Sequence, residues 1–279
     1  MENSNLKVEV FKGKEASVNS YLFENGQSIV VMDVLRNSQE ARELVKVIKG
    51  KNLPLTHILI SHGHPDHFIG MNVVSQAFPA ARIVTPSAEI KTDIIGFSHY
   101  MESIGWLDAE PELKPMTQEN PGGFDYQGKI EVLASDNLEL LGGGTLSINT
   151  AYSSAEAEHL STVYAKDLNA LFTSDFCYNG VHLWLGPGVS RTHIANWKME
   201  LNKLKEQYGG TDTTIYPGHG EKATPALFDT VLGYIACFEE TIKISETEEE
   251  AMNTMKKAYQ QAGINTDDVV EELQKQQTL

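Results

Sequence analysis

One short segment constrains this chain more than any other, because it runs from an apolar strand into a turn rich in histidine and aspartate. Residues 58–60 form an uncharged run, Ile-Leu-Ile, that is typical of a buried strand. Ser, Gly and Pro at positions 61, 63 and 65 then favour a turn. The turn carries four possible metal ligands: His62, His64, Asp66 and His67. Imidazole and carboxylate groups suit zinc and its neighbours, and alternate side chains can converge on two points, so the segment predicts a site for two metals.

The competing interpretation of this segment is a solvated polar loop that is rich in histidine by chance. The whole chain has only nine His among 279 residues. Three of them within six consecutive positions are a strong local enrichment, which favours the metal site.

The pattern His62-x-His64-x-Asp66-His67 after an apolar strand resembles the signature of the metallo-β-lactamase-fold hydrolases. That resemblance implies an α/β (α+β) fold, a four-layer αβ/βα sandwich with the metal site at one edge between two sheets. It also implies three further ligands along the chain: a third His, an Asp that bridges the metals and a last His.

Three later segments contain candidates for these ligands. Residues 152–159 stand where many family members carry Thr-Pro-Gly-His-Thr-Pro-Gly-His, and only His159 matches the ligand position. Glu156 and Glu158 replace family residues there and predict a differently shaped, more acidic loop. Asp175 ends the segment Leu-Phe-Thr-Ser-Asp, similar to the family's Leu-Phe-Thr-Gly-Asp, and His219 lies in Pro-Gly-His-Gly.

The resemblance therefore implies a dinuclear centre with seven protein ligands. The first metal would be bound by His62, His64 and His159, the second by Asp66, His67 and His219, and Asp175 would bridge them. Two Zn²⁺ ions per chain are the expected cofactors, although iron or manganese can occupy similar ligand sets. Asp33, which follows an apolar strand, would support the metal loop from below by the same resemblance.

The chemistry implied by this centre is hydrolysis by a hydroxide held between two metals, with Asp66 accepting its proton. Tyr178 lies three residues after Asp175, where lactonases of the family carry a Tyr that donates a hydrogen bond to the substrate carbonyl; the alternative is an aromatic residue of the pocket wall. A lactone of the acyl-homoserine-lactone type is the first hypothesis for the substrate. The alternatives are a β-lactam, a thioester or phosphoester and, outside enzymes, a degenerate metal-binding protein.

Charge and composition limit the partners. A net charge of -16 and the lack of any Lys/Arg cluster argue against nucleic acid, so a small-molecule substrate is expected. Two Cys cannot form a disulfide scaffold. No segment is apolar enough for a signal peptide or a membrane span, which predicts a cytoplasmic protein without a membrane partner, either a monomer or a homodimer.

The remaining patterns predict how the chain is organised. Residues 1–245 are expected to form the catalytic domain, with an irregular insertion over 88–126 that lines a substrate pocket or covers the core, and residues 246–279 a helical C-terminal extension packed on the body. Strands over 130–133, 138–141 and 145–149 are expected to form a meander. Cys177 is interpreted as a small buried residue rather than a metal thiolate. His182 and Trp184 are candidates for pocket lining or subunit contact.

Overall fold

The structure is a computed structural model that describes residues 5–260, and it contains two sheets that face each other. The first sheet has six strands in sequence order: β1 (Lys7–Lys12), β2 (Asn19–Glu24), β3 (Ile29–Met32), β4 (Leu55–Leu59), β5 (Arg82–Thr85) and β6 (Ile130–Val132). The second has five strands in the order β11-β10-β9-β8-β7: β7 (Asn137–Glu139), β8 (Thr145–Asn149), β9 (Thr162–Ala165), β10 (Ala170–Asn179) and β11 (Thr214–Gly220). Strands β3 to β6 pair in parallel, as do β10 and β11.

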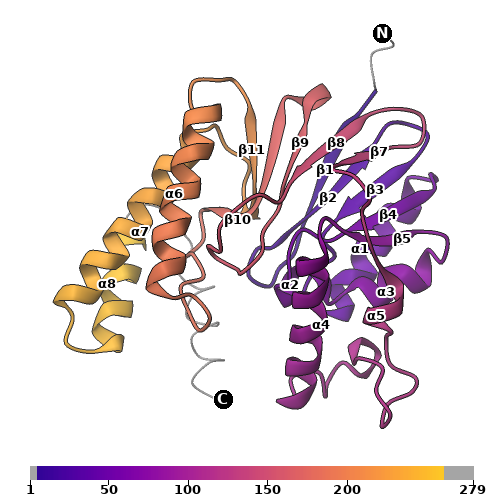
Figure 1. Ribbon diagram of the computed structural model, residues 1–279, viewed down its shortest axis with the longest axis horizontal. Coiled ribbons are helices and arrows are strands. Elements are labelled where there is room, and N and C mark those ends of the chain that lie inside the picture. Colours follow the sequence, from indigo (N-terminus) through magenta and orange to yellow (C-terminus); the bar gives the residue numbers. More distant parts are fainter. Residues whose placement is uncertain (1–4, 261–279) are drawn as a thin grey trace.

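Helices cover the outer face of each sheet (Figure 1). The helices on the first sheet's side are α1 (Ser38–Gly50), α2 (Pro65–Phe68), α3 (Met71–Ala77), α4 (Ala88–Ser103) and α5 (Tyr126–Lys129). Those on the second sheet's side are α6 (Arg191–Tyr208), α7 (Leu227–Ile244) and α8 (Glu248–Gln260). The order helix, sheet, sheet, helix confirms the predicted αβ/βα sandwich.

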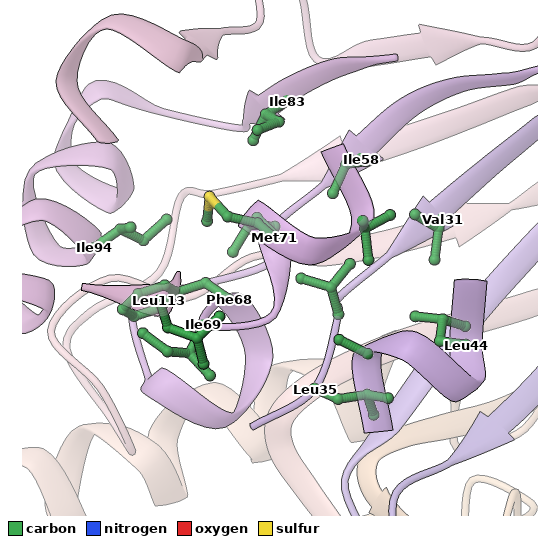
Figure 2. Close-up of a cluster of buried hydrophobic side chains, with 14 of the residues drawn as sticks. Val31, Leu35, Leu44, Ile58, Phe68, Ile69, Met71, Ile83, Ile94 and Leu113 are labelled. Atoms are coloured by element: carbon green, nitrogen blue, oxygen red, sulfur yellow. The ribbon is translucent and has the colours of Figure 1, made fainter. Parts of the chain in front are cut away.

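Three apolar cores hold these four layers together. Phe23, Leu59 and Phe172 belong to the core between the two sheets. A second core lies under α1, α3 and α4, where Figure 2 shows Leu44, Ile58, Phe68, Met71 and Ile94 directed toward one another. The third core lies between the second sheet and its helices and includes Trp197 and Ile235. Because β4 is buried between two of these cores, it needs the apolar run that the sequence shows at residues 58–60.

The region after β5 differs from the prediction in two ways. Residues 88–103 form a regular helix, α4, whose N-cap Ser87 accepts the N–H of Ile90 and which buries Ile90, Ile94 and Met101 on one face. Phe97 and Tyr100, the aromatic residues that made this segment look irregular, lie outside this buried face and are partly exposed. In addition, β6 joins the first sheet beside β5, so residues 130–149 are no continuous meander: only β7 and β8 pair with each other.

The C-terminal part is helical as far as it is described. Helix α7 packs on α6 and β10, and α8 packs on α7. The short helix expected near 267–273 lies outside the described residues, and the division at residue 245 stays a prediction. Within residues 5–260, no helix combines the length and the apolar character that crossing a membrane requires.

Candidate metal centre

The centre lies at one edge of the sandwich, where strands of both sheets end side by side. Strand β4 of the first sheet leads into the loop and short helix α2 that carry His62 to His67. In the second sheet, Asp175 lies on β10 and His219 on the adjacent β11. Strand ends that meet across two sheets therefore bring together side chains up to 157 positions apart in sequence, from 62 to 219.

Two groups of side chains could each hold a metal ion. The first contains His62, His64, Glu156 and Asp175, and the second contains Asp66, His67 and His219. Within each group the candidate ligand atoms lie within 4.8 Å of one another. We call them the first and the second cluster.

In the first cluster, both imidazoles face the Glu156 carboxylate. His64 Nδ1 lies 3.0 Å from Glu156 Oε1, and His62 Nε2 lies 3.9 Å from Glu156 Oε2. His62 Nε2 is also 3.7 Å from Asp175 Oδ2. Two ring nitrogens and two carboxylates thus converge on one small volume that excludes solvent.

In the second cluster, the two imidazoles converge on Asp66. His219 Nε2 lies 3.4 Å from Asp66 Oδ2, and His67 Nε2 lies 3.7 Å from the same oxygen. Asp175 connects this cluster to the first, because its Oδ1 is 3.3 Å from His67 Nε2 and its Oδ2 is 3.2 Å from His219 Nε2. Its two oxygens are therefore placed to serve both clusters at once.

Unpartnered buried atoms show that this arrangement fits metal ions. His62 Nε2, Glu156 Oε2 and Asp175 Oδ1 are fully buried and have no hydrogen-bond partner. A buried polar atom without a partner costs free energy, typically about 1–3 kcal/mol. Each of these atoms belongs to a group of candidate ligands, and a divalent cation held there would give it a partner.

The ring nitrogens that face away from the clusters are held by neighbouring groups. His67 Nδ1 donates to Asp33 Oδ2 at 2.8 Å, and His219 Nδ1 donates to the Ala16 carbonyl at 2.6 Å. His62 Nδ1 lies 3.0 Å from the hydroxyls of both Ser61 and Ser174. Such contacts fix the ring orientation and leave Nε2 free to bind a metal.

The backbone near Asp175 also requires particular residues. A Cβ on Gly218 would lie 1.8 Å from Asp175 Oδ1, so no larger residue fits beside this carboxylate. Ser174 has a φ of 48°, and the pairing of β10 with β11 shifts register there. This irregularity turns the Asp175 side chain toward the edge where the clusters lie.

The structure does not bring His159, the predicted third histidine ligand, to the first cluster. The His159 side chain is 44% exposed, and its Nδ1 is 2.8 Å from Asp93 Oδ2 on α4. Glu156, three residues earlier, points inward and is only 2% exposed. Its neighbours Ala155 and Ala157 are buried in the core under α6 and α7, which fixes the loop in this orientation.

The sequence carries only a weak signal for this inward orientation, namely the small apolar residues that flank Glu156 on both sides. Glu158 lies outside, where it contacts His193. The other six predicted ligands are all in the two clusters.

Tyr178 lies inside the centre rather than on a distant pocket wall. Its hydroxyl donates to Asp175 Oδ2 at 2.7 Å and lies 3.2 Å from Glu156 Oε1. Its ring stacks on that of His219, with the centroids 4.5 Å apart and the planes 3° apart. The phenol therefore touches groups from both clusters.

The electrostatic environment divides the histidines into two kinds. Burial, reinforced by the neighbouring His67, holds the pKa of His62 well below its usual value. Burial also disfavours charge on His64, but the adjacent Glu156 carboxylate outweighs it and raises the His64 pKa to about 9. Burial acts the same way on His67, whose pKa is nevertheless raised well above normal by Asp175, Asp66 and Asp33.

The Asp175 carboxylate stays ionised in this environment. Burial alone would raise the pKa of Asp175, yet the imidazoles of His67, His219 and His62 hold it well below its usual range. Burial raises the pKa of Tyr178 well above 10, and the neighbouring Asp175 adds to the effect, so the phenol keeps its proton. An ionised carboxylate that accepts from a protonated phenol is the state in which both groups can serve a metal centre.

Other candidate residues lie away from the two clusters. Cys177 is fully buried, as predicted, and burial raises the pKa of its thiol to about 12. The His182 ring contacts Tyr234 on α7 and Tyr259 on α8, and Trp184 packs against the core of the same layer. The predicted roles of His182 and Trp184 in a pocket or a subunit contact have no support from these packing contacts.

Aromatic side chains of α4 border the first cluster. The ring of Phe97 meets that of His64 edge-on at 5.6 Å, and Tyr100 follows at 6.4 Å from Phe97. Phe97 is 37% exposed and Tyr100 56% exposed. An apolar surface is thus available directly beside the candidate metal centre.

The comparisons with known proteins agree with this geometry. The sequence model of the metallo-β-lactamase superfamily matches residues 13–219. A hydroxyacylglutathione hydrolase from Vibrio campbellii is 22% identical over 169 residues, which is 60% of this chain and 66% of that protein. A probable metallo-hydrolase from Streptococcus pyogenes is 35% identical over 63 residues, 23% of this chain and 26% of that protein. The chain thus matches less than two thirds of the length of either relative.

Solved structures show the same fold. A metallo-β-lactamase family protein from Thermus thermophilus is 16% identical with a TM-score of 0.66, covering 98% of this chain and 94% of that one. A metallo-β-lactamase from Pontibacter korlensis is 15% identical with a TM-score of 0.57, covering 85% and 97%. At these identities the likeness concerns the fold alone.

Proposed function

Because this chain belongs to the metallo-β-lactamase superfamily and is a metallohydrolase, we propose that it uses two divalent metals to open a lactone of the acyl-homoserine-lactone type. His62, His64 and Asp175 would bind the first metal, and Asp66, His67, His219 and Asp175 the second. Metals held this way lower the pKa of a water, so that hydroxide exists near neutral pH, and polarise the carbonyl that is attacked. The position of Asp175, which lies near His62 of the first cluster and near His67 and His219 of the second, is the observation that carries the two-metal proposal.

Asp66 is the residue best placed to move a proton. Its side chain is 19% exposed, whereas those of Asp175 and Glu156 are 1% exposed. A carboxylate that reaches both the cluster and solvent can accept a proton from the attacking water and pass it to the alcohol that leaves when the ring opens. One water molecule adds across the ester bond, and the ring-opened product is a hydroxy acid.

Tyr178 is proposed to orient the carbonyl of the substrate. Its hydroxyl is protonated and already lies at hydrogen-bond distance from a cluster carboxylate. A carbonyl oxygen that enters the centre can accept the same hydrogen bond in place of Asp175. The phenol would then stabilise the negative charge that develops on that oxygen.

The apolar border formed by Phe97 and Tyr100 supports a substrate with an acyl chain. These rings lie next to His64, so a chain attached near the reacting carbonyl would pass over them. Burial of a chain against such rings contributes roughly 0.8 kcal/mol for each CH₂ group. The observation favours a lactone with an acyl substituent over a small unsubstituted ester.

A second candidate substrate is a hydroxyacylglutathione thioester. The relative from Vibrio campbellii carries that activity in its name, although the matched segments are only 22% identical. A thioester carbonyl would be attacked by the same hydroxide. The two hypotheses differ in what surrounds the carbonyl: an acyl chain in one, a charged peptide in the other.

Hydrolysis assays with the purified enzyme distinguish these substrates. We expect opening of acyl-homoserine lactones to exceed hydrolysis of a hydroxyacylglutathione thioester and of a chromogenic β-lactam by at least about tenfold in kcat/KM. Phe97→Ala should raise KM for a twelve-carbon acyl chain more than for a four-carbon chain. Val10→Ala, on the exposed edge strand β1, is the matched control. Faster turnover of the thioester would replace the lactone proposal by the second candidate.

A further inference from the structure

Besides His62, His64 and the shared Asp175, the first cluster has room for one more protein ligand. The chain offers two candidates within four residues, Glu156 and His159. Only Glu156 lies in the first cluster, with Oε1 3.0 Å from His64 Nδ1 and Oε2 3.9 Å from His62 Nε2. The His159 imidazole instead pairs with Asp93 on α4.

The surroundings of Glu156 call for a cation. Its carboxylate is buried beside a second carboxylate, Asp175, and its Oε2 has no hydrogen-bond partner. Oε1 accepts from Tyr178 and faces His64, whereas the buried Oε2 carries the free-energy cost of an unpartnered polar atom. The orphaned Nε2 of His62 points at the same oxygen, so an ion between these atoms would satisfy both.

We propose that Glu156 binds the first metal in place of a third histidine, and that this carboxylate shifts the first site from zinc toward manganese. The inference rests on the two-metal function proposed above. With Glu156, each metal has two imidazoles and one carboxylate of its own, and Asp175 is shared. With His159 the first metal would have had three imidazoles.

A carboxylate in place of an imidazole changes the net charge of the metal centre and the type of donor atom. Asp66, Glu156 and Asp175 carry three negative charges against the four positive charges of two divalent ions, which leaves a net charge of plus one. A histidine in place of Glu156 would leave a net charge of plus two. Imidazole favours zinc, whereas carboxylate oxygens suit manganese, so the exchange makes the site relatively better for Mn²⁺.

The metal content of the full-length wild type and of two variants tests the ligand assignment. After loading with MnCl₂ or ZnCl₂ and dialysis, the wild type should retain two metals per chain. Glu156→Gln, which keeps the shape of the side chain, should retain one, with the affinity of the first site lowered about a hundredfold or more. His159→Ala should retain two. Loss of a metal from His159→Ala, with two kept by Glu156→Gln, would overturn the assignment.

A competition experiment tests the metal preference. Wild type and Glu156→His are dialysed against equal concentrations of ZnCl₂ and MnCl₂, and bound metals are counted by mass spectrometry. Glu156→His should raise the bound ratio of zinc to manganese at the first site about tenfold or more. Should Glu156→His not fold, Glu156→Gln replaces it, and its remaining site should keep the wild-type ratio.

The outcomes separate this inference from the function on which it rests. An unchanged ratio in Glu156→His would overturn the preference for manganese while leaving the two-metal hydrolase intact. A wild type that retains no metal from either salt would overturn the proposed function itself, and the inference with it. Electron paramagnetic resonance of bound Mn²⁺ gives a second readout, since a coupled pair of ions is expected in wild type and isolated ions in Glu156→Gln.

Discussion

The two clusters have similar donor groups but differ in how the protein holds them. In the second cluster, His67 is fixed by a carboxylate of a strand end, Asp33, and His219 by a backbone carbonyl. In the first cluster, His62 is fixed only by two serine hydroxyls, and Glu156 belongs to a loop. The Ser61 hydroxyl gives its own proton to Asp33 and so accepts from His62 Nδ1, but a hydrogen bond to a charged carboxylate such as Asp33 is roughly twice as strong as one to a neutral hydroxyl. The second cluster is therefore the more rigid of the two.

This difference indicates a division of work within the centre. A cluster whose rings are fixed by strong acceptors should keep its metal when the other cluster is disturbed. The first cluster, which has weaker supports and lies beside the apolar border of α4, is the one that can change its ligand without loss of the fold. Substitutions that affect both clusters, one cluster or neither can test the comparison.

The largest effect is expected for Asp175→Asn, because Asp175 alone belongs to both clusters. Loss of its charge removes a ligand from each metal, and both affinities should fall more than about a hundredfold, since residues that only orient ligands already cost roughly 10–100-fold. Metal content and kcat/KM measure the result, with Asp136→Asn, at an exposed position between β6 and β7, as a surface control. A variant that keeps one tightly bound metal would show that Asp175 serves a single cluster.

A smaller and selective effect is expected for Asp33→Asn. Asp33 accepts from His67 Nδ1 and from the N–H and hydroxyl of Ser61, so the amide leaves the His67 ring less firmly oriented. The affinity for the second metal should fall roughly 10–100-fold, and the affinity for the first metal, which Asp33 supports only through Ser61, should fall less. Asn tolerates the φ of 62° at this position, so the backbone is kept. Stepwise titration with a chelator separates the two sites, and equal weakening of both would contradict the comparison.

A still smaller effect is expected for Ser174→Ala in the first cluster. His62 Nδ1 would keep the Ser61 hydroxyl at 3.0 Å after loss of the Ser174 hydroxyl. The affinity for the first metal should fall less than about tenfold, below the range for partners that have no substitute. The same chelator titration measures it. A loss as large as that of Asp33→Asn would show that hydroxyls hold the ring as firmly as a carboxylate.

Most ligands of both clusters could be predicted from local sequence. Asp66 and His67 share one motif with His62 and His64, and His219 lies in Pro-Gly-His-Gly, so neighbouring residues indicate the direction of these side chains. Asp175 likewise ends an apolar run. Glu156 lies in a loop whose orientation depends on the burial of Ala155 and Ala157 and on Asp93, 66 residues before His159. Such distant contacts leave little trace in a local pattern.

Elements that depend on distant pairing were also the harder ones to predict. Residues 130–132 were expected to pair with the strands that follow them, yet they join β5 in the other sheet. Helix α4 was missed for a different reason: its buried positions, Ile90, Ile94 and Met101, do follow a helical spacing, but exposed aromatic residues obscure it. The metal motif could be recognised because its residues are consecutive in sequence and do not depend on pairing with a distant segment.

A buried histidine outside both clusters gives the smallest effect and marks the limit of the comparison. His182 Nδ1 is 2.6 Å from the Tyr234 hydroxyl, and burial, assisted by Lys256, lowers the His182 pKa to about 4. In the unfolded chain the value is about 6.5. The folded protein therefore resists protonation, so its free energy of unfolding should decrease as the pH falls from about 6.5 to about 4.

His182→Asn should remove this part of the acid sensitivity, because the amide oxygen can still accept from Tyr234 but does not titrate. One proton changes stability by at most about 1.4 kcal/mol per pH unit, and partial contact of the ring with water reduces the effect further. Urea unfolding at pH 7, 5.5 and 4.5 gives the slopes for both proteins, and the difference between them belongs to His182. Metal content should be unchanged at pH 7. If His182→Asn instead released a metal, His182 would belong to the metal centre.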